Sequence, residues 1–127
     1  MGARTYRELV CWQLANDLKL RVYAVTAING VARDVRFCDQ IRDSARGAPR
    51  AIAEGFGRFR PGDFGRYLEY ARASLIETQN HLDDARDCGY VSAAAHRELV
   101  TLADRAIGAV TNLRKYLGRQ RKPEDKS

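Results

Sequence analysis

Apolar side chains recur every three or four residues through four long segments of the chain, and this periodicity limits the possible folds more than any other feature. Side chains at this spacing share one face of an α-helix, so each segment is predicted to be an amphipathic helix. No run alternates apolar and polar residues between turn signals, as a half-buried strand would. The sequence therefore predicts an all-α protein, with helices over residues 6–27, 35–56, 63–88 and 92–117.

Residues that favour helix ends stand at the expected boundaries. Asn29-Gly30 and Gly89 are expected to end the first and third helices. Asp63 and Ser92 are expected to be the N-caps of the third and fourth helices. Pro49 lies inside the second segment, where a proline removes one backbone donor and crowds the preceding turn. We expect a kink near residues 45–49, with a break in the helix as the alternative.

Four helices of similar length with short connections favour one arrangement. About 20 residues make a helix of about 30 Å, and short loops make successive helices neighbours that run in opposite directions. We therefore expect a single domain over residues 1–117, folded as an antiparallel up-down-up-down four-helix bundle. Residues 118–127 are polar, charged and interrupted by Pro123, and are expected to form a disordered tail.

The last segment carries two adjacent apolar rows. They are Ala95, Leu99, Leu102, Ala106, Ala109 and Leu113, and beside them Val100, Ala103, Ile107, Val110 and Leu117. Two rows make a face wider than the core of one bundle normally needs, so part of it is expected to bury against another copy of the chain. The alternative is that the whole face is buried within one chain.

The sequence favours a cytoplasmic protein with no membrane partner. No stretch approaches the roughly 18 apolar residues of a membrane span, and the first residues lack the apolar core of a signal peptide. Cys11, Cys38 and Cys88 are odd in number and far apart, so we interpret them as small buried residues in a reducing compartment.

Basic residues outnumber acidic ones, which gives a formal charge of +6 and a pI of about 9.5. Arginine outnumbers lysine by 18 to four. Because arginine grips phosphate in a bidentate manner and stacks on bases, this balance admits a nucleic-acid or acidic-protein partner. A GC-rich genome would produce the same bias without functional meaning.

Three basic sets are the candidate nucleic-acid-binding residues. They are Arg42, Arg46 and Arg50, a ridge at four-residue spacing; Arg58 and Arg60, among the aromatic residues of a glycine-rich turn; and Arg114 and Lys115, near the end of the last helix. Each set has a structural alternative. The ridge can pair with nearby carboxylates, the rings can pack at a helix entry, and cations at a helix C-terminus favour the helix dipole.

The motifs of the common catalytic and metal sites do not occur in the sequence. A di-metal bundle site needs Glu-x-x-His pairs, but neither His81 nor His96 has a glutamate three residues before it. No Walker A motif or nucleophile elbow occurs. We expect no catalysis, no cofactor and no metal. An enzyme that uses Glu54, Glu77 and His81 is a further hypothesis, which requires these side chains to converge in one pocket.

Motifs along most of the chain carry a family resemblance. They are Leu9, Trp12-Gln13, Ala15, Leu18 and Tyr23; then Gln40-Ile41-Arg42-Asp43-Ser44-Ala45, Ala48-Pro49 and Ile52-Ala53-Glu54-Gly55; then Phe64, Tyr67-Leu68, Ala71, Ser74-Leu75, Glu77, Leu82 and Gly89-Tyr90-Val91. Together they resemble the four-helix bundle protein family, also called the 23S ribosomal RNA intervening sequence proteins, over about residues 6–117. The family often has Ser at the position of Gly47 and Asn at that of Ala51, so this chain lacks two polar side chains.

The resemblance implies an antiparallel four-helix bundle that assembles as a ring-like homopentamer. Some relatives are accessory proteins of diversity-generating retroelements, similar basic barrels that bind nucleic acid and a reverse transcriptase. The motif residues Glu54, Gly55, Ser74 and Glu77 are then structural. We expect the two glutamates to organise helix packing or subunit contacts, with Arg72 or another arginine as partner.

We therefore expect a non-enzymatic homo-oligomeric scaffold that binds DNA or RNA electrostatically, alone or beside a partner such as a reverse transcriptase. The alternative is a pure protein–protein interaction module, whose arginines pair with acidic residues between subunits or on an acidic partner.

Overall fold

The computed structural model describes residues 2–58 and 60–120, and within these it contains helices and no strands. The all-α prediction is confirmed. A short 3-10 helix, η1, precedes five α-helices: η1 Tyr6–Glu8, α1 Val10–Thr26, α2 Asn29–Ala32, α3 Val35–Phe56, α4 Pro61–Asp87 and α5 Ala93–Gln120.

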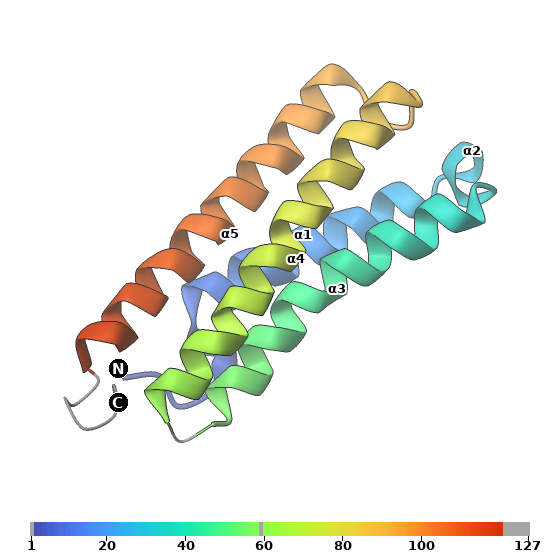
Figure 1. Cartoon of the computed structure of the whole chain (residues 1–127). Helices are drawn as coiled ribbons and strands as arrows, with labels where there is room; N and C mark the ends of the chain where they lie inside the picture. Colours follow the sequence, from blue (N-terminus) through green and yellow to red (C-terminus); the bar gives the residue numbers. More distant parts are fainter. Residues whose placement is uncertain (1, 59, 121–127) are drawn as a thin grey trace.

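The four long helices lie side by side, and the chain turns back between one long helix and the next (Figure 1). Helix α3 packs against α1 and α4, and α5 packs against α1 and α4, so each long helix has two long neighbours. One apolar core lies between them. Each helix contributes fully buried side chains to it, for example Leu18, Ile41, Leu75 and Val110.

The first expected helix is divided in the structure, so this boundary prediction was wrong. Leu9 has an extended backbone between η1 and α1. A capping arrangement fixes this entry, because the Glu8 carboxylate accepts hydrogen bonds from the backbone amides of Arg4 at 2.6 Å and Thr5 at 2.8 Å.

Asn29-Gly30 does not act as the stop of the first helix. Helix α1 ends at Thr26, and Asn29 begins the single turn of α2. This turn places Val31 in the core, where it is buried. Burial of an apolar side chain a few residues later therefore overrides the local signal of the Asn-Gly pair.

Helix α4 begins two residues before the expected N-cap. Arg60 is the N-cap and Pro61 the first helical residue, so Asp63 lies inside the first turn. Proline suits this position because its missing amide hydrogen has no partner there in any helix.

The other two expected helix ends are confirmed. Gly89 adopts a φ of 77°, and the amide of Tyr90 donates to the carbonyl of Ala85 at 2.8 Å, which closes α4 as in a Schellman motif. The Ser92 hydroxyl accepts from the amide of Ala95 at 3.0 Å and so caps α5. Helix α5 continues to Gln120, past the expected end, and residues 121–127 of the expected disordered tail lie outside the described residues.

Pro49 lies within a continuous helix. Helix α3 runs without interruption over the expected range, so the alternative of a break is wrong. The proline ring is buried in the bundle, and the missing hydrogen bond is tolerated there because Ala48 before it and Ile52 after it are packed into the same core.

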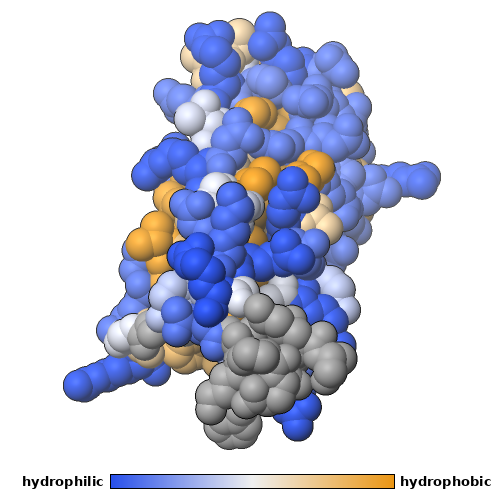
Figure 2. Space-filling view, turned by 60° about the vertical axis from the view of Figure 1, so that its left-hand side comes forward, coloured by the Kyte–Doolittle hydropathy of each residue, from blue (hydrophilic) through white to orange (hydrophobic). Residues whose placement is uncertain are grey.

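The two apolar rows of α5 are covered within the chain itself. Six of their eleven residues are buried, and the other five, Ala95, Val100, Ile107, Ala109 and Leu113, are half-buried. Figure 2, which brings the α5 side of the molecule forward, shows a mainly hydrophilic face with smaller hydrophobic patches. Burial within one chain therefore accounts for the width of this apolar face, so the width gives little support for a subunit interface.

Helices α3 and α4 approach each other closely over small residues. A Cβ atom built at Gly55 would lie 2.8 Å from both the Phe64 ring and the Tyr67 Cβ, and one built at Gly47 would lie 2.7 Å from the Ser74 hydroxyl. Between the same helices the buried Thr78 hydroxyl donates to the Ser44 hydroxyl at 2.9 Å. The absence of a side chain at Gly47 is thus matched by Ser74 on the facing helix.

Substitution of Gly55 by alanine is expected to destabilise the fold. The added methyl group would overlap Phe64 and the rigid Cβ of Tyr67, and overpacking of this kind costs about 1–3 kcal/mol. The control is Gly108→Ala on α5, where nothing lies within 4 Å of the new atom and a gain of about 0.5–1 kcal/mol is expected from helix propensity. Urea unfolding at fixed protein concentration measures both. A Gly55→Ala variant as stable as Gly108→Ala would contradict the close approach.

Candidate nucleic-acid interface

A groove of about 320 Å³ runs between α1 and α3 on the side of the bundle. Its lining combines cationic, aromatic and small residues and includes no carboxylate: Tyr6, Trp12, Asn16, Lys19, Tyr23, Arg46, Pro49, Arg50 and Ala53. This surface combines the chemistry of phosphate binding with that of base stacking.

The position of the groove follows from the helix periodicity. On α1, Trp12, Asn16, Lys19 and Tyr23 are spaced by four, three and four residues and form one face. Each follows directly after a buried core residue: Cys11, Ala15, Leu18 and Val22. On α3 three of the four lining residues, Arg46, Pro49 and Ala53, likewise follow directly after the core residues Ala45, Ala48 and Ile52. Burial of the two core rows therefore brings the two lining faces together.

The cations of the groove have no ion-pair partner among the described residues. Within residues 2–58 and 60–120, no ion pair involves Lys19, Arg46 or Arg50. Asp43 and Glu54 stand about one helical turn from the two arginines, but neither lines the groove. Three exposed or half-buried positive charges are thus left facing a common space.

Two aromatic contacts form the ends of the groove. At one end the rings of Tyr6 and Trp12 meet edge to face, with centroids 5.2 Å apart and an interplanar angle of 66°. At the other end the Tyr23 ring lies under two cations, with Arg42 at 4.9 Å and the Lys19 ammonium at 5.8 Å from its centroid.

The expected arginine ridge of α3 divides into two parts with different surroundings. Arg42 is half-buried, and its Nε donates to the Thr26 hydroxyl at 2.8 Å while the guanidinium covers Tyr23. It therefore ties α3 to the end of α1. Arg46 and Arg50 are exposed and belong to the groove.

The arginine–aromatic turn is engaged with its own chain. Arg58 donates to the Tyr67 hydroxyl at 2.6 Å, and its guanidinium lies 4.9 Å from the centre of the same ring. Arg60 is exposed at the start of α4. Phe59, which the sequence places between them, lies outside the described residues.

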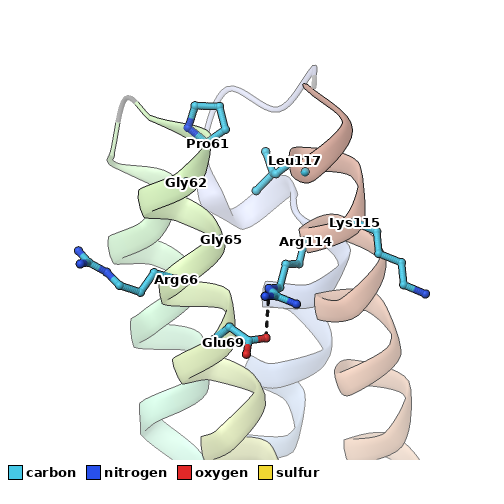
Figure 3. A pocket seen from close by; sticks show the side chains of 9 residues that line it. Pro61, Gly62, Gly65, Arg66, Glu69, Arg114, Lys115 and Leu117 are labelled. Carbon is cyan, nitrogen blue, oxygen red and sulfur yellow. Dashed lines mark ion pairs between the residues drawn. The ribbon is translucent and has the colours of Figure 1, made fainter. Parts of the chain in front are cut away.

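Arg114 and Lys115 lie at a second pocket, at the end of the bundle where α4 begins and α5 nears its end (Figure 3). Arg114 points inward and forms an ion pair with Glu69 at 3.2 Å. Arg66 and Lys115 point out to opposite sides of this pocket (Figure 3). The cations here do not converge, and two of them are already paired, Arg114 with Glu69 and Arg66 with Asp63 at 4.0 Å.

The motif glutamates Glu54 and Glu77 are both exposed. Glu77 contacts the His81 ring at 3.4 Å on its own helix, and among the described residues neither glutamate forms an ion pair with Arg72. Glu54 precedes Gly55 on α3, and Gly55 packs against Tyr67 on α4. Glu77 lies ten residues after Tyr67, which is about 15 Å further along the axis of α4. The structure does not bring Glu54 together with Glu77 and His81. Ser74 is half-buried, opposite Gly47.

Two of the three cysteines are buried as predicted. Cys88 is exposed, because it caps the end of α4 at the turn to α5. Burial raises the pKa of the Cys11 thiol to about 11, which keeps it protonated and unreactive near neutral pH. In the described part of the chain, no three His, Cys, Asp or Glu side chains lie close enough together to hold a metal ion. None of the described helices combines the length and apolar character of a membrane span.

The α1 half of the groove was not predicted from the sequence. Arg46 and Arg50 were among the predicted nucleic-acid-binding residues, whereas Lys19, Trp12 and Tyr23 were not. The signal was present in the regular spacing of these residues beside the core row. This spacing alone does not show which side of the core row faces α3, because a neighbouring helix can lie on either side of the row. The position of α3 in the bundle is needed to decide this.

These features define a basic helical bundle protein with an open, cation-rich and aromatic groove between two of its helices. The model of the 23S rRNA-intervening sequence protein family matches residues 7–112, and the chain belongs to this family. The resemblance inferred from the sequence motifs is thereby confirmed. No curated protein matches the chain.

Proposed function

We propose that this protein is a non-enzymatic scaffold that binds nucleic acid electrostatically, and that the α1/α3 groove is its main contact. The observation that carries the proposal is the lining of the groove, which holds Lys19, Arg46 and Arg50 without a carboxylate or an ion pair among the described residues. The net charge of +6 adds a long-range attraction for polyanions. The name of the family, which refers to 23S rRNA, is consistent with such a role.

Replacement of Arg46 and Arg50 by alanine is expected to weaken nucleic-acid binding about tenfold at low salt. For each phosphate that these arginines hold, the replacement should also reduce the slope of log K against log salt by about 0.7–0.9. Fluorescence anisotropy with a labelled oligonucleotide over a salt series measures both quantities. Both side chains are exposed, so the fold should be retained.

The matched control removes Arg97 and Arg105, two exposed arginines of α5 that line a hollow together with Arg21, Asp17 and Glu98. It changes the net charge equally but should leave affinity within about twofold, because this hollow contains two carboxylates and no aromatic ring to stack on a base. Equal decreases in affinity for the two double variants would show that only overall charge matters. No binding of DNA or RNA by the wild-type protein at low salt would overturn the proposed function and favour the protein–protein module.

We further propose that an antiparallel up-down-up-down bundle is the subunit of a cytoplasmic homopentamer that acts beside a partner such as a reverse transcriptase. The family to which the chain belongs supports this arrangement by resemblance. On the chain itself, the large exposed apolar side chains that a subunit contact could cover include Tyr70 and Ile76 on α4, 52% and 43% exposed, and Leu20 on α1.

The wild-type chain is expected to form particles of five times 14.3 kDa in mass photometry or light scattering. Ile76→Glu should reduce this mass, because a charge would replace an apolar contact. Asn80→Glu, at an exposed position one turn further along α4, is the control for added charge. A wild-type mass of a single chain over the accessible concentration range would contradict the assembly.

A further inference from the structure

We propose that the α1/α3 groove takes single-stranded nucleic acid, with one unpaired base stacked on the Trp12 indole and its flanking phosphates held by Arg46 and Arg50. This inference rests on the proposed function and specifies the ligand of the same groove. It follows from which aromatic ring is open to a ligand, from the shape of the groove and from the position of its charges.

Trp12 is the ring of the groove that is open to a base. The Tyr23 ring is covered by Arg42 and approached by Lys19, and Arg7 lies over the Tyr6 ring at 4.6 Å from its centroid. No cation of the described chain covers Trp12, and the Tyr6 ring meets it at an interplanar angle of 66°, so this contact takes at most one face of the indole. The indole is half-buried and held in place, so a base can stack on it with little loss of side-chain entropy.

The groove is concave and small, which favours a single strand over a duplex. Its volume of about 320 Å³ is at the lower end of the range for small-molecule sites, about 300–1,000 Å³. A base inside a duplex is stacked on both faces and cannot lie against a ring in a groove. An unpaired base exposes both faces, and stacking on aromatic side chains is the usual way in which proteins hold such bases.

The polar groups of the groove are placed to hold the rest of the nucleotide. Arg46 and Arg50 lie one turn apart on α3, with the small or compact Pro49 and Ala53 beside them, so α3 leaves space for a base and supplies charge for phosphates. On α1 the Asn16 amide lies one turn from Trp12 and can both donate to and accept from a base edge. Lys19 extends the positive charge along the strand.

Trp12 is the one tryptophan of the chain, so its fluorescence reports on the groove directly. The experiment titrates the wild-type protein with a thymidine DNA strand of about 20 nucleotides and with a duplex of equal length, at one low salt concentration. Fluorescence quenching and anisotropy are read in parallel. We expect the single strand to quench Trp12 and to bind at least about tenfold more tightly than the duplex.

Two variants separate stacking from charge. Trp12→Ala should weaken single-strand binding about tenfold with an unchanged salt slope, because it removes a ring and no charge. Trp12→Phe keeps a ring in place and should retain most of the affinity by anisotropy. Circular dichroism checks the fold, and if Trp12→Ala does not fold, the wild-type quenching and Trp12→Phe decide the question.

The possible failures are distinguishable. Equal binding of single strand and duplex without quenching, together with a loss of affinity in the Arg46/Arg50 double variant, would overturn this inference and leave the proposed function intact. Absence of binding to either form would overturn both. Trp12→Ala with wild-type affinity for the single strand would show that no base stacks on the indole.

Discussion

Burial of one apolar row from each of α1, α3, α4 and α5 in a common core is the constraint on which the rest of the structure depends. The core row of α1 that contains Leu18 packs against the core row of α3 that contains Ile41 and Ile52. On one side of this contact, the residues next to the two rows then face one another across the seam, the line along which α1 and α3 meet. On α1 those residues include Trp12 and Lys19. The groove is therefore a consequence of core packing and does not need a specialised loop.

The same core explains why this seam is open while another is tight. Helices α3 and α4 meet over Gly47 and Gly55, where there is no room for even one added methyl group. Between α1 and α3 the seam is bordered by large aromatic and long basic side chains, which leave a groove between them. Among the described arginines, Arg42, Arg58 and Arg114 are engaged with partners of their own chain. Arg46 and Arg50 form no ion pair with any described residue.

Much of the fold could be predicted from the sequence, because the helices are long and strongly periodic. Helix α3 was predicted to the residue, and Gly89 and Ser92 end and begin their helices as expected. The errors fall where packing overrides local preference. Val31 is drawn into the core and turns the Asn29-Gly30 segment into a helical turn, and Pro61 starts α4 ahead of Asp63.

The candidate site could be predicted only in part. Spacing along α3 was enough to single out Arg46 and Arg50, but it could not separate them from Arg42, whose hydrogen bond to Thr26 depends on how α1 and α3 meet. Trp12 and Lys19 form a regular row that lies beside the core positions. Which side of the core row faces a neighbouring helix is a property of the assembled bundle, and a single helix does not contain that information.

The most direct test of the account is to map where nucleic acid touches the chain. Ultraviolet cross-linking of a single-stranded oligonucleotide to the wild-type protein, followed by mass spectrometry of the peptides, locates the contact without any substitution. The account predicts cross-links within residues 6–23 and 46–53, the two stretches that line the α1/α3 groove. Cross-links confined to α5, or to the end pocket around Arg114 and Lys115, would contradict it.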